Sequence, residues 1–166
     1  KYLLYFKGNL WNPHWRGVHG VAIGKSPTGP FTALDEFVFD FKTDDGKIAS
    51  AEDPYVWYHN EHKRFYATFK DFSGKITGTE PGLALLFSND GIKWTKPQNS
   101  FFMKRELLFH NGILKVSNLE RPQLLLDDNG FPKVLYAACS VESVGGKIDG
   151  STFNVQIPLF QNKKEF

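Results

Sequence analysis

Hydrophobic and aromatic residues occur along the chain in short runs, several of which alternate with polar positions. Each run has the length of a typical β-strand, and no apolar pattern with helical period extends over about ten residues. Turn-forming residues separate the runs at 26–30, 44–46, 89–91 and 127–130. The pattern predicts strands over Tyr2–Phe6, Val18–Ile23, Tyr55–Tyr58, Arg64–Phe69, Leu83–Phe87, Gln123–Leu126, Val134–Ala138 and Phe153–Leu159.

The composition agrees with an all-β fold. Aromatic residues make up 16% of the 166 residues, with 16 Phe and a single Met, and aromatic side chains fit the pleated surface of a sheet. The single cysteine, Cys139, excludes an intramolecular disulfide, and we expect it to be a small buried hydrophobe within a strand. We predict a single all-β domain over residues 1–166.

Charge excludes several classes of partner. The net charge is +2, and no basic run is longer than Lys163-Lys164, so neither a nucleic-acid-binding nor a membrane-binding surface is indicated. No apolar stretch approaches the roughly 18 residues that span a bilayer. No cofactor motif occurs, and His14 and His19 lack a suitably spaced third ligand for zinc.

Segments of the chain recur in the same order at spacings of about 62 to 70 residues. The matching pairs are Phe6–Gly8 with Phe69–Asp71, Gly20–Ser26 with Gly82–Ser88, Glu52–Val56 with Glu120–Leu124, and Phe65–Ala67 with Leu135–Ala137. A repeat of this size with about four short antiparallel strands is typical of a β-propeller blade. The chain would hold about two and a half blades, and a propeller closes from at least about four. We therefore predict a partial propeller with broad apolar faces exposed at both ends; a β-sandwich is the alternative.

The repeats would bring acidic residues together at the mouth of the propeller channel. Glu52-Asp53-Pro54 opens one predicted innermost strand, and Glu120-Arg121-Pro122 opens the next. Two carboxylates from neighbouring blades suit glycoside hydrolysis, in which one group protonates the leaving oxygen and another activates water or tunes its partner's pKa. We therefore take Asp53 and Glu120 as the candidate catalytic residues. The alternative is that both are turn acids that accept backbone hydrogen bonds.

Other polar and aromatic residues would line the same mouth. Within the predicted loop Leu10–His19, Trp15 could stack on a sugar, while Arg16 and His19 could donate to its hydroxyls. The alternative is that the Trp residues fill a gap between blades and the His residues are solvated.

Lys70 and Asp71 end a second strand near this mouth, although Lys7 and Lys70 could simply protect sheet edges. We expect Arg121 to point away from Glu120, toward substrate. The turn that contains His59, Glu61 and His62 is predicted to be solvated at the opposite end.

Short motifs carry a resemblance to a known group of enzymes. Asp53-Pro54, Glu120-Arg121-Pro122, the stretch 26–31 and the stretch 88–94 resemble the five-bladed β-propeller glycosidases of glycoside hydrolase family 43 and the related families 32, 68 and 117. The resemblance implies that Asp53 modulates pKa and holds the sugar, that Glu120 is the general acid, and that the general base lies upstream of Lys1. The Glu-Asp-Pro step is also similar to the family 130 phosphorylases.

The resemblance implies an incomplete glycoside hydrolase that acts on an oligo- or polysaccharide without a cofactor. The chain begins at Lys1 directly before a predicted strand, without an initiator Met, so we expect upstream blades from the same protein or a partner chain. The chain alone is then expected not to hydrolyse glycosides. Secretion or a periplasmic location would follow from the resemblance. A non-catalytic glycan-binding or interaction propeller and a glycoside phosphorylase are the alternative functions.

Overall fold

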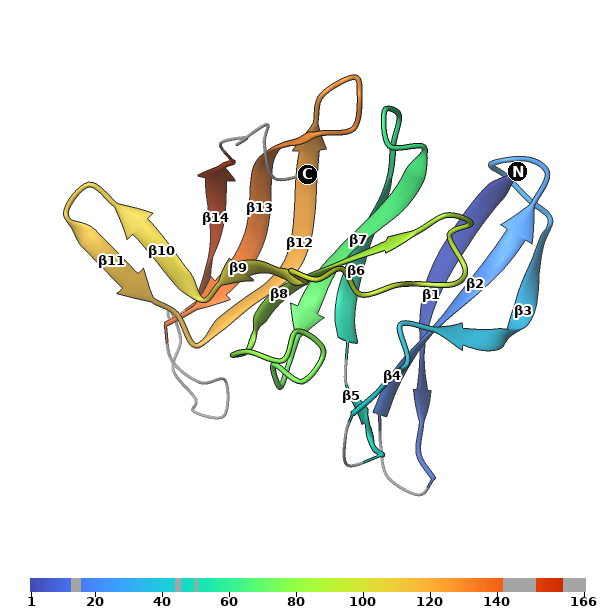
Figure 1. Cartoon of the computed structure of the whole chain (residues 1–166), viewed down its shortest axis with the longest axis horizontal. Helices are drawn as coiled ribbons and strands as arrows, with labels where there is room; N and C mark the ends of the chain where they lie inside the picture. The colour runs from blue at the N-terminus through green and yellow to red at the C-terminus, as the bar shows by residue number, and fades with distance from the viewer. Residues whose placement is uncertain (13–15, 44–45, 50, 142–151, 160–166) are drawn as a thin grey trace.

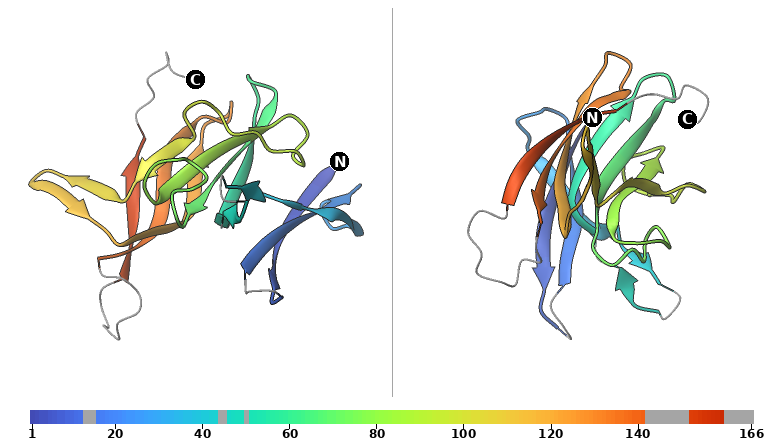
Figure 2. Two further views of the ribbon diagram at one scale, coloured as in Figure 1. Left: turned by 60° about the horizontal axis from the view of Figure 1, so that its bottom comes forward. Right: turned by 90° about the vertical axis from the view of Figure 1, so that its left-hand side faces the viewer.

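The computed structural model describes residues 1–12, 16–43, 46–49, 51–141 and 152–159. All regular structure in these residues is β, which confirms the all-β prediction. Three larger antiparallel sheets follow one another along the chain, and within each sheet every strand pairs with the next in sequence. Figure 1 and the left view of Figure 2 show the three sheets side by side in chain order.

The strands of the three sheets are as follows. The first sheet comprises β1 (Tyr2–Leu10), β2 (Arg16–Gly24) and β3 (Phe31–Val38). The middle sheet comprises β6 (Ala51–His59), β7 (Arg64–Asp71), β8 (Gly82–Ser88) and β9 (Phe101–Lys104). The third sheet comprises β12 (Asn118–Leu126), β13 (Pro132–Ser140) and β14 (Thr152–Pro158). Short pairs connect the sheets: β4 (Phe41–Lys42) with β5 (Ile48–Ala49), and β10 (Glu106–Phe109) with β11 (Gly112–Lys115).

The eight predicted strands correspond to β1, β2, β6, β7, β8, β12, β13 and β14, with boundaries that differ by a few residues. The sequence pattern missed β3, β9 and the two short connecting pairs. In β3 the exposed Thr32, Asp35 and Glu36 interrupt the alternation on which the prediction depended. The predicted loop Leu10–His19 was wrong at both ends, because Leu10 belongs to β1 and Arg16–His19 belong to β2.

The sequence repeat corresponds to a repeated arrangement of strands. Strand β6 matches β12, β7 matches both β1 and β13, and β8 matches β2. Among the described residues, the first sheet has no strand equivalent to β6, and the third has none equivalent to β9. The described sheets do not close into a ring, so the five-bladed propeller remains a prediction.

Two hydrophobic cores lie on either side of the middle sheet. One core joins it to the first sheet and includes Val21, Phe69 and Leu86. The other joins it to the third sheet and includes Leu83 and Leu135, together with Cys139, whose predicted burial is confirmed. Because successive side chains of a strand point to opposite faces, Leu83 and Ala84 of β8 belong to different cores. Burial in the second core raises the pKa of the Cys139 thiol to about 11. The middle sheet is therefore covered on both faces.

The outer faces of the end sheets differ. On the first sheet, Tyr2, Leu4 and Phe6 of β1 are each more than two-fifths exposed, as expected for an apolar face without a neighbour. On the third sheet the corresponding face mixes the exposed Leu125 and Tyr136 with polar residues of β14. The prediction of two apolar end faces therefore describes the first sheet and only part of the third. No helix in the described residues is long and apolar enough to cross a membrane.

The β6–β7 turn and the β12–β13 turn are bound to each other at one end of the sheets. The Asn60 backbone N–H donates to Asn129 O at 2.8 Å, and Trp57 Nε1 donates to Gly130 O at 3.0 Å. His59 and His62 stack with ring centroids 3.8 Å apart, and Phe131 meets both rings edge-on. We call this contact between the two turns the clasp.

The clasp corrects the prediction of a solvated turn for His59, which is buried, and in part for His62, which is half-buried, whereas Glu61 is exposed as predicted. His59 is 3% exposed, its Nδ1 accepts the backbone N–H of His62, and its Nε2 is buried with no partner in the described structure. His62 also bonds the Tyr66 hydroxyl at 2.8 Å. Burial and the neighbouring His62 lower the pKa of His59. The prediction failed because contacts between two turns far apart in sequence leave no local pattern.

Candidate functional site

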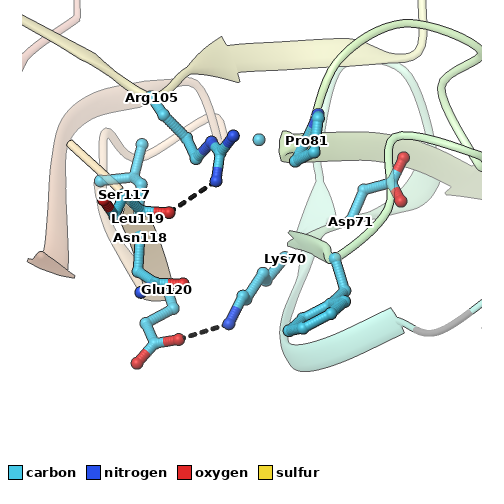
Figure 3. A pocket seen from close by; sticks show the side chains of 10 residues that line it. Lys70, Asp71, Pro81, Arg105, Ser117, Asn118, Leu119 and Glu120 are labelled. Carbon is cyan, nitrogen blue, oxygen red and sulfur yellow. Dashed lines mark hydrogen bonds and ion pairs between the residues drawn. The ribbon is translucent and has the colours of Figure 1, made fainter. Parts of the chain in front are cut away.

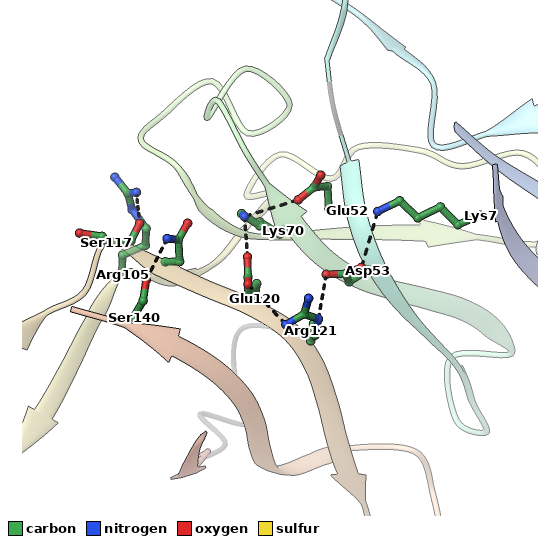
Figure 4. A network of polar contacts seen from close by, with 10 residues as sticks. Lys7, Glu52, Asp53, Lys70, Arg105, Ser117, Glu120, Arg121 and Ser140 are labelled. Carbon is green, nitrogen blue, oxygen red and sulfur yellow. Dashed lines mark hydrogen bonds and ion pairs between the residues drawn. The ribbon is translucent and has the colours of Figure 1, made fainter. Parts of the chain in front are cut away.

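Charged residues gather at the opposite end of the same sheets from the clasp. Strands β6 and β12 begin there and β7 ends there, so Glu52, Lys70 and Glu120 meet although they are far apart in sequence (Figure 4). Strand β1 brings Lys7 to the same place. The site thus consists of side chains from three sheets.

A repeated backbone distortion shapes the site. The ladder shifts register between Glu52 and Tyr55 in β6, and between Glu120 and Gln123 in β12. Within these irregularities Asp53 and Arg121 have φ angles of 51° and 53°, a left-handed conformation that non-glycine residues rarely adopt. Such bulges bend a strand and re-aim its side chains. The distortion therefore directs the Asp53 and Arg121 side chains toward one another.

Lys70 lies at the centre of the site. Its Nζ is 2.6 Å from Glu120 Oε2 and 3.4 Å from Glu52 Oε2, and its side chain is 11% exposed. The same ammonium lies 4.9 Å from the centroid of the Phe72 ring. Strand pairing supports this placement, since Lys70 is directly opposite Glu52 in the ladder. Lys70 therefore links the acidic residues of the middle and third sheets.

Arg121 joins the two candidate catalytic carboxylates. Its Nε lies 3.9 Å from Asp53 Oδ2 and its Nη1 lies 3.6 Å from Glu120 Oε1, while Lys7 is 3.8 Å from Asp53. The expectation that Arg121 points away from Glu120 is therefore wrong. One guanidinium therefore lies close to both acids, so that the two carboxylates approach the same point from different sheets.

An open cleft of about 540 Å³ adjoins this network between the middle and third sheets (Figure 3). Lys70, Phe72 and Glu120 form one part of its lining, and Arg105 and Asn118 form another. Arg105 Nη1 donates to Ser117 O at 2.6 Å, and Asn118 Nδ2 donates to Ser140 Oγ at 2.9 Å. The cleft therefore combines cations, an acid, an amide and an aromatic ring, the groups with which proteins bind polar ligands.

Asp71 lines the cleft but its carboxylate is directed into the β7–β8 loop (Figure 3). It is fully buried and accepts the backbone N–H groups of Gly74, Ile76 and Thr77, together with the Thr77 hydroxyl. Buried carboxylates need such donors to offset their lost hydration. Asp71, which we predicted to bind substrate, thus fixes the loop that forms the rim of the cleft.

Arg16 and His19, which were also predicted to bind substrate, contact other protein groups instead of lining the cleft. Arg16 makes two bonds to the Asp40 carboxylate, at 3.0 and 3.1 Å. His19 is 3% exposed and packs edge-on against Phe39; burial, and then the charge of Lys7, lower its pKa. Trp15 and His14 lie outside the described residues. In this conformation, Arg16 and His19 are engaged with protein groups or buried.

The prediction missed two residues of this site. Glu52 contacts Lys70, and the repeat could have revealed it because Glu52 occupies the position of Glu120. Arg105 follows β9, which the sequence pattern did not predict, so no signal placed it at the cleft. No group of three His, Cys, Asp or Glu that could hold a metal ion occurs in the part of the chain that the structure describes.

Comparisons of the chain with protein-family models, with curated proteins and with solved structures give no match.

Proposed function

We propose that this chain is part of a five-bladed β-propeller that hydrolyses a glycosidic bond at the site around Asp53 and Glu120. Three features support the propeller: the repeated strand order, the middle sheet covered on both faces, and the apolar outer face of β1. A further sheet, from the same protein or a partner chain, would cover that face and supply an inner strand beside β1.

The observation that carries the proposed activity is the convergence of two equivalent bulges. Each begins a matching strand, each contains a left-handed residue before proline, and together they bring carboxylates from two sheets to one guanidinium. Strained, non-glycine backbone of this kind occurs preferentially at functional sites. An open cleft lined by cations, an amide and an aromatic ring, groups that suit a sugar ligand, adjoins the site.

In this proposal Glu120 donates a proton to the leaving glycosidic oxygen, while water adds to the anomeric carbon and loses a proton to a base. Asp53 holds the sugar and influences the charge state of Glu120. The base would come from a sheet outside the described three. Lys70 and Arg121 must then release Glu120 when substrate enters, because a general acid has to carry a proton before it acts.

The contacts of Lys70 and Arg121 with Glu120 favour a second candidate function, which is glycan binding without hydrolysis. A carboxylate held by two cations is suited to accepting hydrogen bonds from sugar hydroxyls. In this case substitution of Glu120 would weaken glycan binding, and no turnover would be found for any substrate.

The test replaces Glu120 with Gln in the full-length protein, with Glu106→Gln as the control. Glu106 is a surface residue of β10 that pairs loosely with Lys115. For a proton donor, Glu120→Gln should lower turnover of substrates with poor leaving groups by about 10²-fold or more, while activated aryl glycosides lose far less. Equal loss on both substrate types would contradict the acid role. Glycan binding without turnover in the unmodified protein would favour the second candidate.

A further inference from the structure

Among the described residues, every charge that lines the cleft is paired except one. Glu120 contacts Lys70 and Arg121, and Asp71 is occupied by donors from its own loop. Arg105 also lines the cleft, yet it forms no ion pair with any carboxylate of the described residues. The cleft therefore contains a half-buried guanidinium without a counter-ion in the part of the chain that the structure describes.

The Arg105 side chain is anchored by a hydrogen bond to Ser117, directly before the strand that begins at Asn118. Its Nη1 donates to Ser117 O, and its own carbonyl accepts the Val116 N–H at 3.0 Å. Ser117 is in turn bound through its N–H to Ser140 O and through its hydroxyl to Val141 O. Figure 3 shows the guanidinium directed across the cleft toward Pro81. The bond to Ser117 reduces the side-chain freedom that would be lost when an anion binds, which favours affinity.

The groups around Arg105 indicate the kind of ligand. A guanidinium has five N–H donors in a planar fork that matches a carboxylate. Asn118 donates its amide N–H₂ to Ser140, and its carbonyl oxygen, which accepts no hydrogen bond from the described residues, can accept a hydroxyl. Phe72 is 58% exposed at the same cleft and offers a ring face to the C–H groups of a sugar.

We propose that Arg105 binds the carboxylate of a uronic acid residue, so that the ligand of this site is an acidic glycan. The inference rests on the proposed function, since it identifies the sugar class that the site around Glu120 receives. The uronate carboxylate would lie against Arg105, and the sugar ring would extend along the cleft toward Lys70 and Glu120.

The experiment measures binding of matched acidic and neutral glycans by calorimetry in the full-length protein. The probes are oligosaccharides from glucuronoxylan, pectin and hyaluronan, each before and after chemical reduction of its carboxyl groups. We expect at least one acidic form to bind about tenfold more tightly than its reduced form. This preference should decrease as salt is raised, because the contact is ionic.

Variants test whether Arg105 causes the preference for the acidic glycan over its reduced form. Arg105→Gln should abolish it while affinity for the reduced glycan stays within about twofold, and Arg105→Lys should retain part of it, because a point charge replaces the fork. Lys115→Gln removes an equal charge from an exposed site on β11 and should leave the preference intact. If Arg105→Gln fails to fold, Arg105→Lys tests the inference, because an undiminished preference for the acidic form in that variant would contradict a contact with the guanidinium fork.

Several outcomes would overturn the inference. Equal binding of acidic and reduced forms would overturn it and leave the proposed function standing. Competition by acetate as strong as by the uronate glycan would mean that the cleft binds free carboxylates and no sugar. A folded protein that binds no glycan in either form would overturn the proposed function as well.

Discussion

The two ends of the β6–β7 and β12–β13 hairpins are built in opposite ways. At the clasp, backbone hydrogen bonds and stacked rings join the turns. There β6 and β7 keep regular pairing, whereas β12 and β13 shift register once more between Leu125 and Leu126. At the charged end, the same strands are bulged and their left-handed residues carry exposed or half-exposed charges. One end therefore joins the sheets through many short-range contacts, whereas the other end joins them through ion pairs.

The two ends of the strands are therefore expected to contribute differently to the stability of the fold. Partly exposed ion pairs contribute little to stability because water and salt compete for them. Packed aromatic rings and buried hydrogen bonds contribute more. The clasp and the two cores can thus hold the sheets while the charged end keeps a strained, polar geometry available for a ligand.

The largest expected effect is the loss of stability when the clasp is opened. Trp57→Ala removes a side chain that is 7% exposed, together with its bond to Gly130, and should lower the free energy of unfolding by about 3–5 kcal/mol. Urea denaturation measures the change. Trp57→Phe, which keeps most of the packing, should cost only about 1–2 kcal/mol. Equal stability of Trp57→Ala and the unmodified protein would mean that the clasp does not hold the sheets.

A smaller loss is expected at the charged end. Lys70→Met leaves Glu52 and Glu120 facing each other without their shared cation, and should cost about 1–3 kcal/mol at neutral pH. The deficit should shrink in acid, where protonated carboxylates no longer repel, and denaturation curves at several pH values would detect this. Lys104→Met breaks the exposed pair with Glu80 and should cost less than about 0.5 kcal/mol. A deficit that is constant with pH would contradict the ionic role of Lys70.

The clasp should also respond to pH. The pKa of His59 is lowered by burial and by His62, and raised to a lesser extent by Glu61 and Asp127. The unfolded chain therefore binds more protons than the folded one, so stability should fall as pH drops below the ordinary histidine value of about 6.5. His19, whose pKa is also lowered, contributes in the same direction.

The control for this pH dependence is His59→Phe, which keeps a ring of similar size. Its stability should change less between pH 7.5 and pH 5.5 than that of the unmodified protein, although His19 preserves part of the dependence. Thermal melts across this range make the comparison. An unchanged pH profile in His59→Phe would show that protonation of the clasp has no energetic consequence.

The smallest effect concerns the strained backbone. Arg121→Gly and Arg121→Ala both remove the guanidinium, but only glycine accepts a φ of 53° without steric cost. We expect the glycine variant to be more stable than the alanine variant by about 1 kcal/mol. The opposite order, which chemical denaturation would reveal, would indicate that the bulge in β12 relaxes when the Arg121 side chain is removed.

Particular residues show how much of the site could be predicted. The repeat paired Glu52 with Glu120, and local apolar alternation located the strands that carry them, so the approach of residues from β6 and β12 was predictable. The partners of Arg121 were not predictable, because its flexible side chain can reach several charges that different strands bring together. Arg105 was missed because β9 has no clear alternation, and the clasp was missed because its contacts join turns about 70 residues apart.

The sequence alone determined the all-β class, the principal strands and the positions at which repeated acidic motifs begin them. These features depend on local alternation, turn-forming residues and internal repeats, all of which can be identified from the sequence itself. The tertiary structure decided which charges pair, which histidines are buried and which cation of the cleft has no counter-ion among the residues that the structure describes. Such properties depend on distances and burial between segments remote in sequence, and a change of an ångström or two in packing alters them.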